Sequence, residues 1–277
     1  MILYVGFVGY PLVQALILSL YRFRGVSARR KFIGFENFQK LWGDDIFRRA
    51  ATNNLVLLAG AGITILVLAL VLSHALRGGG RVAKAARAVY LFPQIVSLVV
   101  VAVLWQFIFN PTGLFNAGLE KAGLGNFTKA WLGESKWALA AVGVTFIWWA
   151  VGFYIMIFEA GLKQIPEEVN EAAALDGSLG WHRFKAVTWP LLWSIKRVAV
   201  IYLVINTMNV FALVFLMTRG GPDHASEVML THLYDQAFVN SSFGYATAVA
   251  IGNFVVVMLL TSVVLFAFRR NPVEGRR

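Results

Sequence analysis

Residues 166–190, PEEVNEAAALDGSLGWHRFKAVTWP, form the longest interval in the second half of the chain that mixes acids, bases, small residues and glycines. Such side chains could serve acid–base catalysis, bind a metal or contact another protein. Neither the carboxylates nor the four histidines of the chain have the spacing of a catalytic or metal site. The chain has no cysteine, which excludes disulfides, thiol catalysis and cysteine-based metal sites. We therefore predict no catalytic residue, metal or cofactor in this chain, and interpret the segment as a contact surface.

The first half of this segment has the pattern of a short helix with a small-residue face. Pro166 suits a first helical turn, and the glutamates that follow it complement the helix dipole. The residues at spacing i, i+3, i+4 and i+7 are Val169, Ala172, Ala173 and Asp176. Gly177 is expected to end the helix in a sharp turn before a second short helix. Two interpretations remain open: a face on which another protein docks, or an amphipathic connector anchored in the membrane interface by Trp181.

Amides and aromatic rings inside the long apolar runs are the other candidates for chemistry. Aromatic rings and amides inside a helical bundle can contact a polar solute. The candidates for such contacts are Gln94, Trp105, Gln106, Trp148, Trp149, Tyr154, Asn206, Asn209 and Asn253. Asn206 and Asn209 rank first because their i, i+3 spacing places them on one helix face. The alternatives are interfacial anchoring for the tryptophans and hydrogen bonding between helices for the asparagines.

Long apolar runs must position these side chains. Apolar residues make up 58% of the 277 residues and charged residues 14%, with a mean hydropathy of +0.68, whereas soluble domains have about 45–50% and about 25%. Six runs reach the length of about 20 residues that a helix needs to cross a bilayer. They cover residues 2–20, 55–76, 88–109, 137–160, 190–217 and 246–268. We predict an all-α integral membrane protein with six transmembrane helices in one domain, 1–277, with residues 166–189 outside the membrane.

The net charge of +11 comes from loops and tails. We interpret it as contact with anionic lipid headgroups rather than with nucleic acid. Lys and Arg are divided almost equally between the two sides of the expected topology, so they do not orient the chain. Lys196 and Arg197 are expected to extend from the fifth run to the membrane surface.

The 166–190 segment resembles the EAA motif of the membrane subunits of binding-protein-dependent ABC importers. That motif has Glu-Ala-Ala, three residues, Gly, nine residues, an aliphatic residue, one residue, an apolar residue and Pro. The matching positions here are Glu171, Ala172, Ala173, Gly177, Val187, Trp189 and Pro190, with Trp189 where Leu is usual. The stretches GFENFQKLW, ATNNLVLL, GGP at 220–222 and FGYATAVA are similar to sugar permeases of the maltose and glycerol-phosphate type.

The resemblance implies a type I ABC importer permease fold in which the EAA loop forms a pair of coupling helices. Contact with a cytoplasmic ATPase would then fall to Glu171, Ala172, Ala173, Leu175, Asp176 and Gly177. ATP and Mg would be bound by that partner, because this chain carries no Walker motif. The expected function is therefore transport of a sugar or oligosaccharide, without an ATPase site in this chain.

The resemblance also implies the partners and the location. We expect a second homologous permease in a heterodimer, two ATPase subunits and an extracytoplasmic solute-binding protein that docks near Gly220, Gly221 and Pro222. The expected location is the inner membrane of a prokaryote, with several spans and cytoplasmic termini. The alternative is an ion-coupled secondary transporter of a small polar solute, but such carriers keep acids in their span centres, and here almost none occur.

Overall fold

The computed structural model describes residues 2–25, 30–76 and 80–271. Residues 77–79 and 272–277, which carry part of the basic charge of the chain, lie outside the described residues. The described chain is helical apart from one antiparallel pair of two-residue strands, β1 (Tyr21–Arg22) and β2 (Lys31–Phe32). This small hairpin is the exception to the all-α prediction.

Four helical segments in the described chain are long and apolar enough to cross a membrane. They match the second, fourth, fifth and sixth expected spans. Their bounds are Asp45–Ala75 (α4, Asp45–Leu57; η2, Leu58–Gly62; α5, Ile63–Ala75), α9 (Ala138–Lys163), Trp193–Met217 (α13, Trp193–Met208; α14, Ala212–Met217) and α16 (Phe243–Ala267). The first of these begins ten residues earlier than expected, because Asp44 caps it by accepting hydrogen bonds from the backbone N–H groups of Ile46 (2.9 Å) and Phe47 (3.1 Å).

The third expected span, 88–109, is not one continuous helix. It is divided between α6 (Gly80–Ile95) and α7 (Leu98–Ile108), whose axes differ by 101°. Ser97 takes an extended backbone conformation (ψ 135°) between them. Pro93, inside α6, has no backbone N–H to donate to the preceding turn, which weakens the helix just before the break. The bent pair accounts for a fifth span only if both parts are counted together.

The first expected span, 2–20, is built from α1 (Ile2–Tyr4), η1 (Val5–Gly9) and α2 (Tyr10–Ser19). Its apolar helix, Val5–Ser19, is shorter than the four long segments. The remaining elements lie in the links between the long helices. They are α3 (Glu36–Gly43), α8 (Leu114–Lys121), η3 (Gly125–Phe127), α10 (Glu167–Leu175), α11 (Gly180–Arg183), η4 (Phe184–Thr188), α12 (Trp189–Leu191), α15 (Met229–Tyr234) and η5 (Asp235–Val239).

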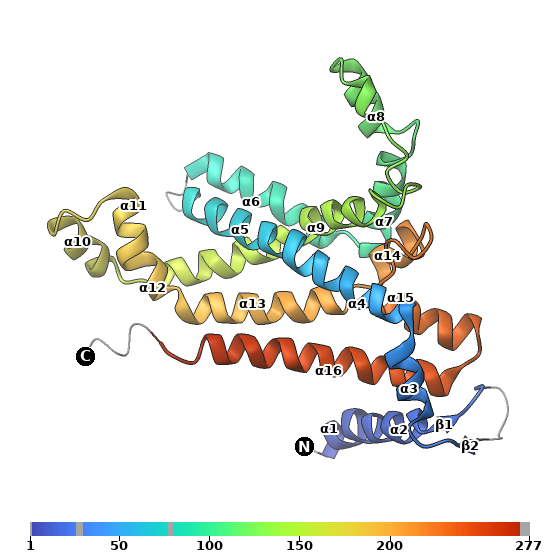
Figure 1. Cartoon of the computed structure of the whole chain (residues 1–277). Helices are drawn as coiled ribbons and strands as arrows, with labels where there is room; N and C mark the ends of the chain where they lie inside the picture. The colour runs from blue at the N-terminus through green and yellow to red at the C-terminus, as the bar shows by residue number, and fades with distance from the viewer. Residues whose placement is uncertain (1, 26–29, 77–79, 272–277) are drawn as a thin grey trace.

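Helix α9 lies at the centre of the packing, in contact with α5, α6 and α13. Its buried side chains include Phe146, Tyr154 and Ile155. Gly152 lets the backbone of α6 approach, since a Cβ at Gly152 would lie 3.0 Å from the carbonyl carbon of Tyr90. The long helices run side by side between two ends (Figure 1). We name them the α10 end, which carries α10, α11 and the last described residues, and the α8 end, which carries α8, α14 and the hairpin.

Candidate functional site

The segment 166–190 folds as a short helix, a turn and a second helical stretch at the α10 end (Figure 1). Pro166 is the residue before α10, and the helix itself begins at Glu167. Gly177 has φ +73°, a left-handed conformation that costs glycine nothing. The N–H of Ser178 donates to the carbonyl of Ala173 (2.8 Å), and the N–H of Gly177 donates to that of Ala174 (3.0 Å). These two bonds form a Schellman turn, which ends the helix where the sequence predicts.

Most of the surface of α10 is exposed. Leu175 is 89% exposed, and Glu171, Ala172 and Asp176 are also exposed. Ala173 is buried against its own chain, with 7% of its surface exposed. A hollow of about 580 Å³ lies between α10 and the helical stretch that follows the turn. Its walls include Ala172, Ala173, Asp176, His182 and Val187. The small-residue face therefore forms one wall of a hollow instead of a flat surface.

A pocket with mostly apolar walls and two asparagines lies where the Trp193–Met217 segment is interrupted, between the end of α13 and the start of α14. Its volume is about 250 Å³, and its walls include Trp149, Asn206, Asn209 and Phe211. The Nδ2 of Asn253, on α16, lies 3.4 Å from the Oδ1 of Asn209. The structure thus brings together candidates from three helices, at a site where the backbone is irregular. In membrane proteins, such backbone is tolerated where protein surrounds it or where it faces a cavity.

The other candidates for the path take part in packing. The Nε2 of Gln106 donates to the carbonyls of Leu216 (2.5 Å) and Met217 (3.3 Å), which joins α7 to α14. Gln94 donates to the carbonyl of Trp149. The rings of Trp105 and Trp148 pack edge to face, 5.7 Å apart. Tyr154 is fully buried in the core around α9. These side chains shape the walls around the pocket, and none of them lines it.

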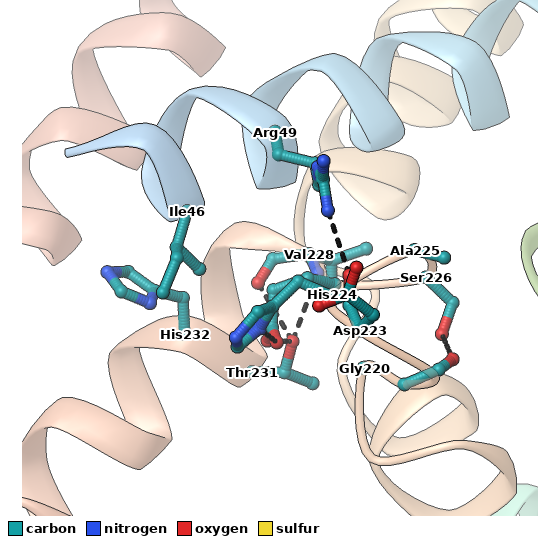
Figure 2. Close-up of polar contacts among 12 residues, drawn as sticks. Ile46, Arg49, Gly220, Asp223, His224, Ala225, Ser226, Val228, Thr231 and His232 are labelled. Carbon is teal, nitrogen blue, oxygen red and sulfur yellow. Dashed lines mark hydrogen bonds and ion pairs between the residues drawn. The ribbon is translucent and has the colours of Figure 1, made fainter. Parts of the chain in front are cut away.

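The GGP loop lies at the α8 end, where His224, Ser226 and Thr231 surround it (Figure 2), and it is built around the buried carboxylate of Glu227. Glu227 is 1% exposed, and its Oε2 lies 2.8 Å from the Nδ1 of His224, while the hydroxyl of Thr231 donates to its Oε1. Gly220 has φ +80°, and a Cβ there would lie 2.7 Å from the Cδ of Glu227. Ser226 closes the loop by donating to the carbonyl of Gly221 (2.6 Å). Gly220 is therefore required by the packing of the loop itself.

Comparison with known proteins gives the family of the chain. The family model "Binding-protein-dependent transport system inner membrane component" matches residues 65–271. The chain belongs to this family. It is 34% identical to the probable ABC transporter permease protein YurN of Bacillus subtilis, over 97% of this chain and 93% of that protein. It is also 34% identical to the diacetylchitobiose uptake system permease protein NgcF of Streptomyces coelicolor, over 96% of this chain and 79% of that protein.

The fold is also found in a solved transporter. A chain of a bacterial ABC transporter involved in the import of the acidic polysaccharide alginate matches 98% of this permease, with a TM-score of 0.79 and 23% identity, and 92% of that chain is covered. The relatives are permease proteins of ABC transporters, so the prediction of a transport subunit in place of an enzyme is confirmed. The prediction of the permease family from the EAA motif is confirmed as well.

Two adjacent asparagines of α4, which were not among the predicted site residues, hold the segment 225–229 that follows the GGP loop of this permease. The Nδ2 of Asn53 donates to the carbonyls of Ala225 (3.1 Å) and Glu227 (2.8 Å). The buried Asn54 donates to the carbonyl of Thr207 (2.9 Å) and accepts from the N–H of Met229 (3.0 Å). Figure 2 shows Arg49 of α4 reaching toward the carbonyl of Asp223, at 2.8 Å. The signal in the sequence is the amide pair at the start of an apolar run.

Asp44 joins three elements at the α8 end of the permease. Its Oδ1 caps α4, and its Oδ2 accepts from the hydroxyl of Tyr245 on α16 and lies 3.2 Å from the Nε2 of the buried His232 on α15. Burial disfavours the charged carboxylate, but the hydrogen bonds from Tyr245 and the α4 backbone, together with the nearby His232, hold the pKa of Asp44 below its usual range. The ionised form of the Asp44 carboxylate is therefore the one that these contacts with α4, α15 and α16 stabilise.

Proposed function

We propose that this permease is one of two membrane subunits of an ATP-driven importer for a sugar or oligosaccharide. The permease family and its relatives support this proposal, since one relative is a diacetylchitobiose uptake permease and a solved neighbour belongs to an alginate importer. The proposed complex contains a second homologous permease, two ATPase subunits that bind ATP and Mg, and an extracytoplasmic solute-binding protein. In a bacterium such a complex lies in the inner membrane.

The proposed topology has six spans in the single domain 1–277. Val5–Ser19 would be the first span and the bent pair α6 and α7 the third, each completed by packing against neighbouring subunits or helices. The α10 end would face the cytoplasm together with both termini, and the α8 end would face the binding protein. The Gly220–Pro222 loop is held firmly by Asn53 and by Glu227, which suits a surface that must present one shape to a docking protein.

The observation that carries the coupling proposal is the exposed α10 helix with its Schellman turn. Glu171, Ala172, Leu175 and Asp176 are exposed, and Gly177 fixes the direction in which the chain leaves the helix. Small side chains permit close approach of an ATPase surface, and acids in the segment can pair with basic residues at its rim. Ala173 would support this contact from beneath, because it is buried in its own chain.

The proposed substrate path passes the pocket at the interruption of the Trp193–Met217 segment. Among its walls, Asn206 and Asn209 offer amide groups and Trp149 offers a ring, which are the groups that bind a polyol. Asn253 would hold the side chain of Asn209 in place. Gln106, Trp148 and Tyr154 would shape the path through the packing described above.

The experiment that tests this function is uptake by the whole complex. The permease would be expressed with its partner permease, ATPase and binding protein, reconstituted in liposomes, and supplied with labelled diacetylchitobiose and other oligosaccharides. Asn209→Ala should raise the KM for uptake about tenfold or more, as expected when an amide that pairs with substrate is lost. Asn240→Ala, an exposed amide in the link before α16, serves as the matched control. Uptake driven by an ion gradient without ATP would refute the proposal.

A further inference from the structure

The segment that carries α10 is attached to α13 through a short and irregular joint. Helix α12 covers only Trp189–Leu191, and Leu192 has φ −77° and ψ 9° before α13 begins at Trp193. Figure 1 shows α12 between α11 and α13 at the α10 end. Movement of α10 can reach α13 only if this joint resists bending.

A buried lysine spans the joint. Lys196, expected to extend to the membrane surface, is instead 7% exposed and folds back across the break. Its Nζ donates to the carbonyl of Trp189 (2.8 Å) and lies 3.6 Å from the centre of the Trp189 ring. The ring of Trp193 lies on another side of the same ammonium group, at 5.7 Å. The prediction for Lys196 is therefore wrong, because two indole rings and a carbonyl replace the water that it would find at the surface.

The interactions of Lys196 are unusual for a buried cation. Among the residues that the structure describes, none of the ion pairs includes it. A buried ammonium needs compensation, and here the compensation comes from a carbonyl and from the faces of aromatic rings. Both the carbonyl and the nearer ring belong to Trp189, on the far side of the joint. The neighbouring Arg197 is exposed, so only Lys196 of these two adjacent basic residues is buried.

The joint is also packed against α9. Leu192 is fully buried in a cluster with Leu162 and Ile165. Gly161 of α9 makes room for it, since a Cβ at Gly161 would lie 3.0 Å from Leu192 Cδ2. Trp189 stands at a position where the EAA motif usually has Leu, which has no ring to hold a cation. The lysine and the tryptophan therefore form a pair that depends on this departure from the motif.

We propose that Lys196 is a positioning residue that stiffens this joint and thereby transmits displacement of α10 to α13. The proposal rests on the proposed coupling to an ATPase. Helix α13 carries Asn206, ten residues beyond Lys196 and about 15 Å along the axis, and ends before Asn209. A stiff joint moves the pocket that Asn206 and Asn209 line when α10 moves, whereas a loose joint bends at Leu192 and lets ATP hydrolysis proceed without transport.

The test compares Lys196→Met with Lys196→Arg in the reconstituted complex. Lys196→Met nearly keeps the length of the side chain and removes its charge. It should lower the amount of solute transported per ATP hydrolysed about tenfold, because a desolvated cation–π contact and its hydrogen bond are lost. Lys196→Arg, which can still stack on indole, should restore most of the ratio. Arg197→Met is the matched control and should leave the ratio unchanged.

A second variant separates coupling from folding. Trp189→Leu restores the usual residue of the motif and should lower the ratio about threefold, as expected for loss of the ring alone. In that background Lys196→Met should have a smaller effect than in the wild type, because part of its interaction is already gone.

Three results would overturn the inference. One is a wild-type ratio of transport to hydrolysis in Lys196→Met. Another is a lower amount of assembled complex with an unchanged ratio, which would make Lys196 a residue of stability only. The third is an equal loss in Lys196→Arg and Lys196→Met. Failure of the proposed function would look different, since the wild-type complex would then show no ATP-driven uptake.

Discussion

Replacing Gly177 should lower solute transport and substrate-stimulated ATP hydrolysis together, while the permease still folds and inserts. Gly177 has φ +73°, and a Cβ built on it meets no heavy atom within 4 Å. The cost of Gly177→Ala is therefore backbone strain without a clash, about 1–2 kcal/mol for an L-residue in the left-handed region. Since about 1.4 kcal/mol is a factor of ten, the turn should be populated about tenfold less relative to competing conformations.

A graded series tests whether the backbone is the cause. Asn tolerates the left-handed region better than Ala, so uptake should decrease in the order Gly177, Gly177→Asn, Gly177→Ala and Gly177→Val. The assay measures solute uptake and substrate-stimulated ATP hydrolysis in reconstituted liposomes, together with the amount of permease in the membrane. Stimulated hydrolysis should decrease along with uptake, because the ATPase senses the permease through this turn.

Gly123 provides a control of equal strain at the other end. It has φ +76° with open space around it, and the N–H of Leu124 donates to the carbonyl of Leu119 (2.8 Å) in the same type of helix end. Gly123→Ala should leave both uptake and substrate-stimulated hydrolysis at the wild-type level. Normal substrate-stimulated hydrolysis in Gly177→Val would refute the reasoning, and so would equal activity of the Asn and Ala variants at a reduced level.

Two further predictions concern the α8 end. Asn54→Leu leaves the carbonyl of Thr207 and the N–H of Met229 without their buried partner, and should destabilise the purified permease by about 2–4 kcal/mol. Thermal unfolding in detergent measures this loss, and Asn240→Leu is the exposed control. Equal unfolding temperatures of the two variants would contradict the prediction. Asp44 has a folded-state pKa below its ordinary value of 3.8, so its stabilising contribution is present above about pH 4 and is lost as the pH falls through the folded value. The gap in unfolding temperature between wild type and Asp44→Asn should therefore stay constant from about pH 7 to 5 and narrow below about pH 4, whereas a gap that widens in acid would show that the sign is wrong.

The long helices were predictable because length and apolar composition decide what can cross a bilayer, and both are properties of a contiguous stretch. The turn at Gly177 was predictable for a similar reason, since a single residue type suits the left-handed end of a helix. The bend between α6 and α7 was not predicted, because Pro93 alone does not reveal that the backbone turns three residues later, at Val96 and Ser97.

The residues of the candidate substrate path could also be predicted only in part. The i, i+3 spacing placed Asn206 and Asn209 together, but nothing local separates a lining amide from one such as Gln106, whose partners lie 110 residues away. The burial of Lys196 escaped prediction because it depends on how the chain turns back at Leu192.

The asparagine pair of α4 also has a consequence for how the permease is made. The partners of Asn53 and Asn54 lie up to 175 residues further along the chain. A ribosome releases the first half of the molecule into the membrane long before residues 225–229 exist. During that interval the two amides lack the carbonyls and the N–H that they bind in the finished structure. The Asp45–Ala75 segment therefore reaches its final position only when the last third of the chain has been synthesised, and we expect the early half to rely on other proteins or on water at the membrane surface until then.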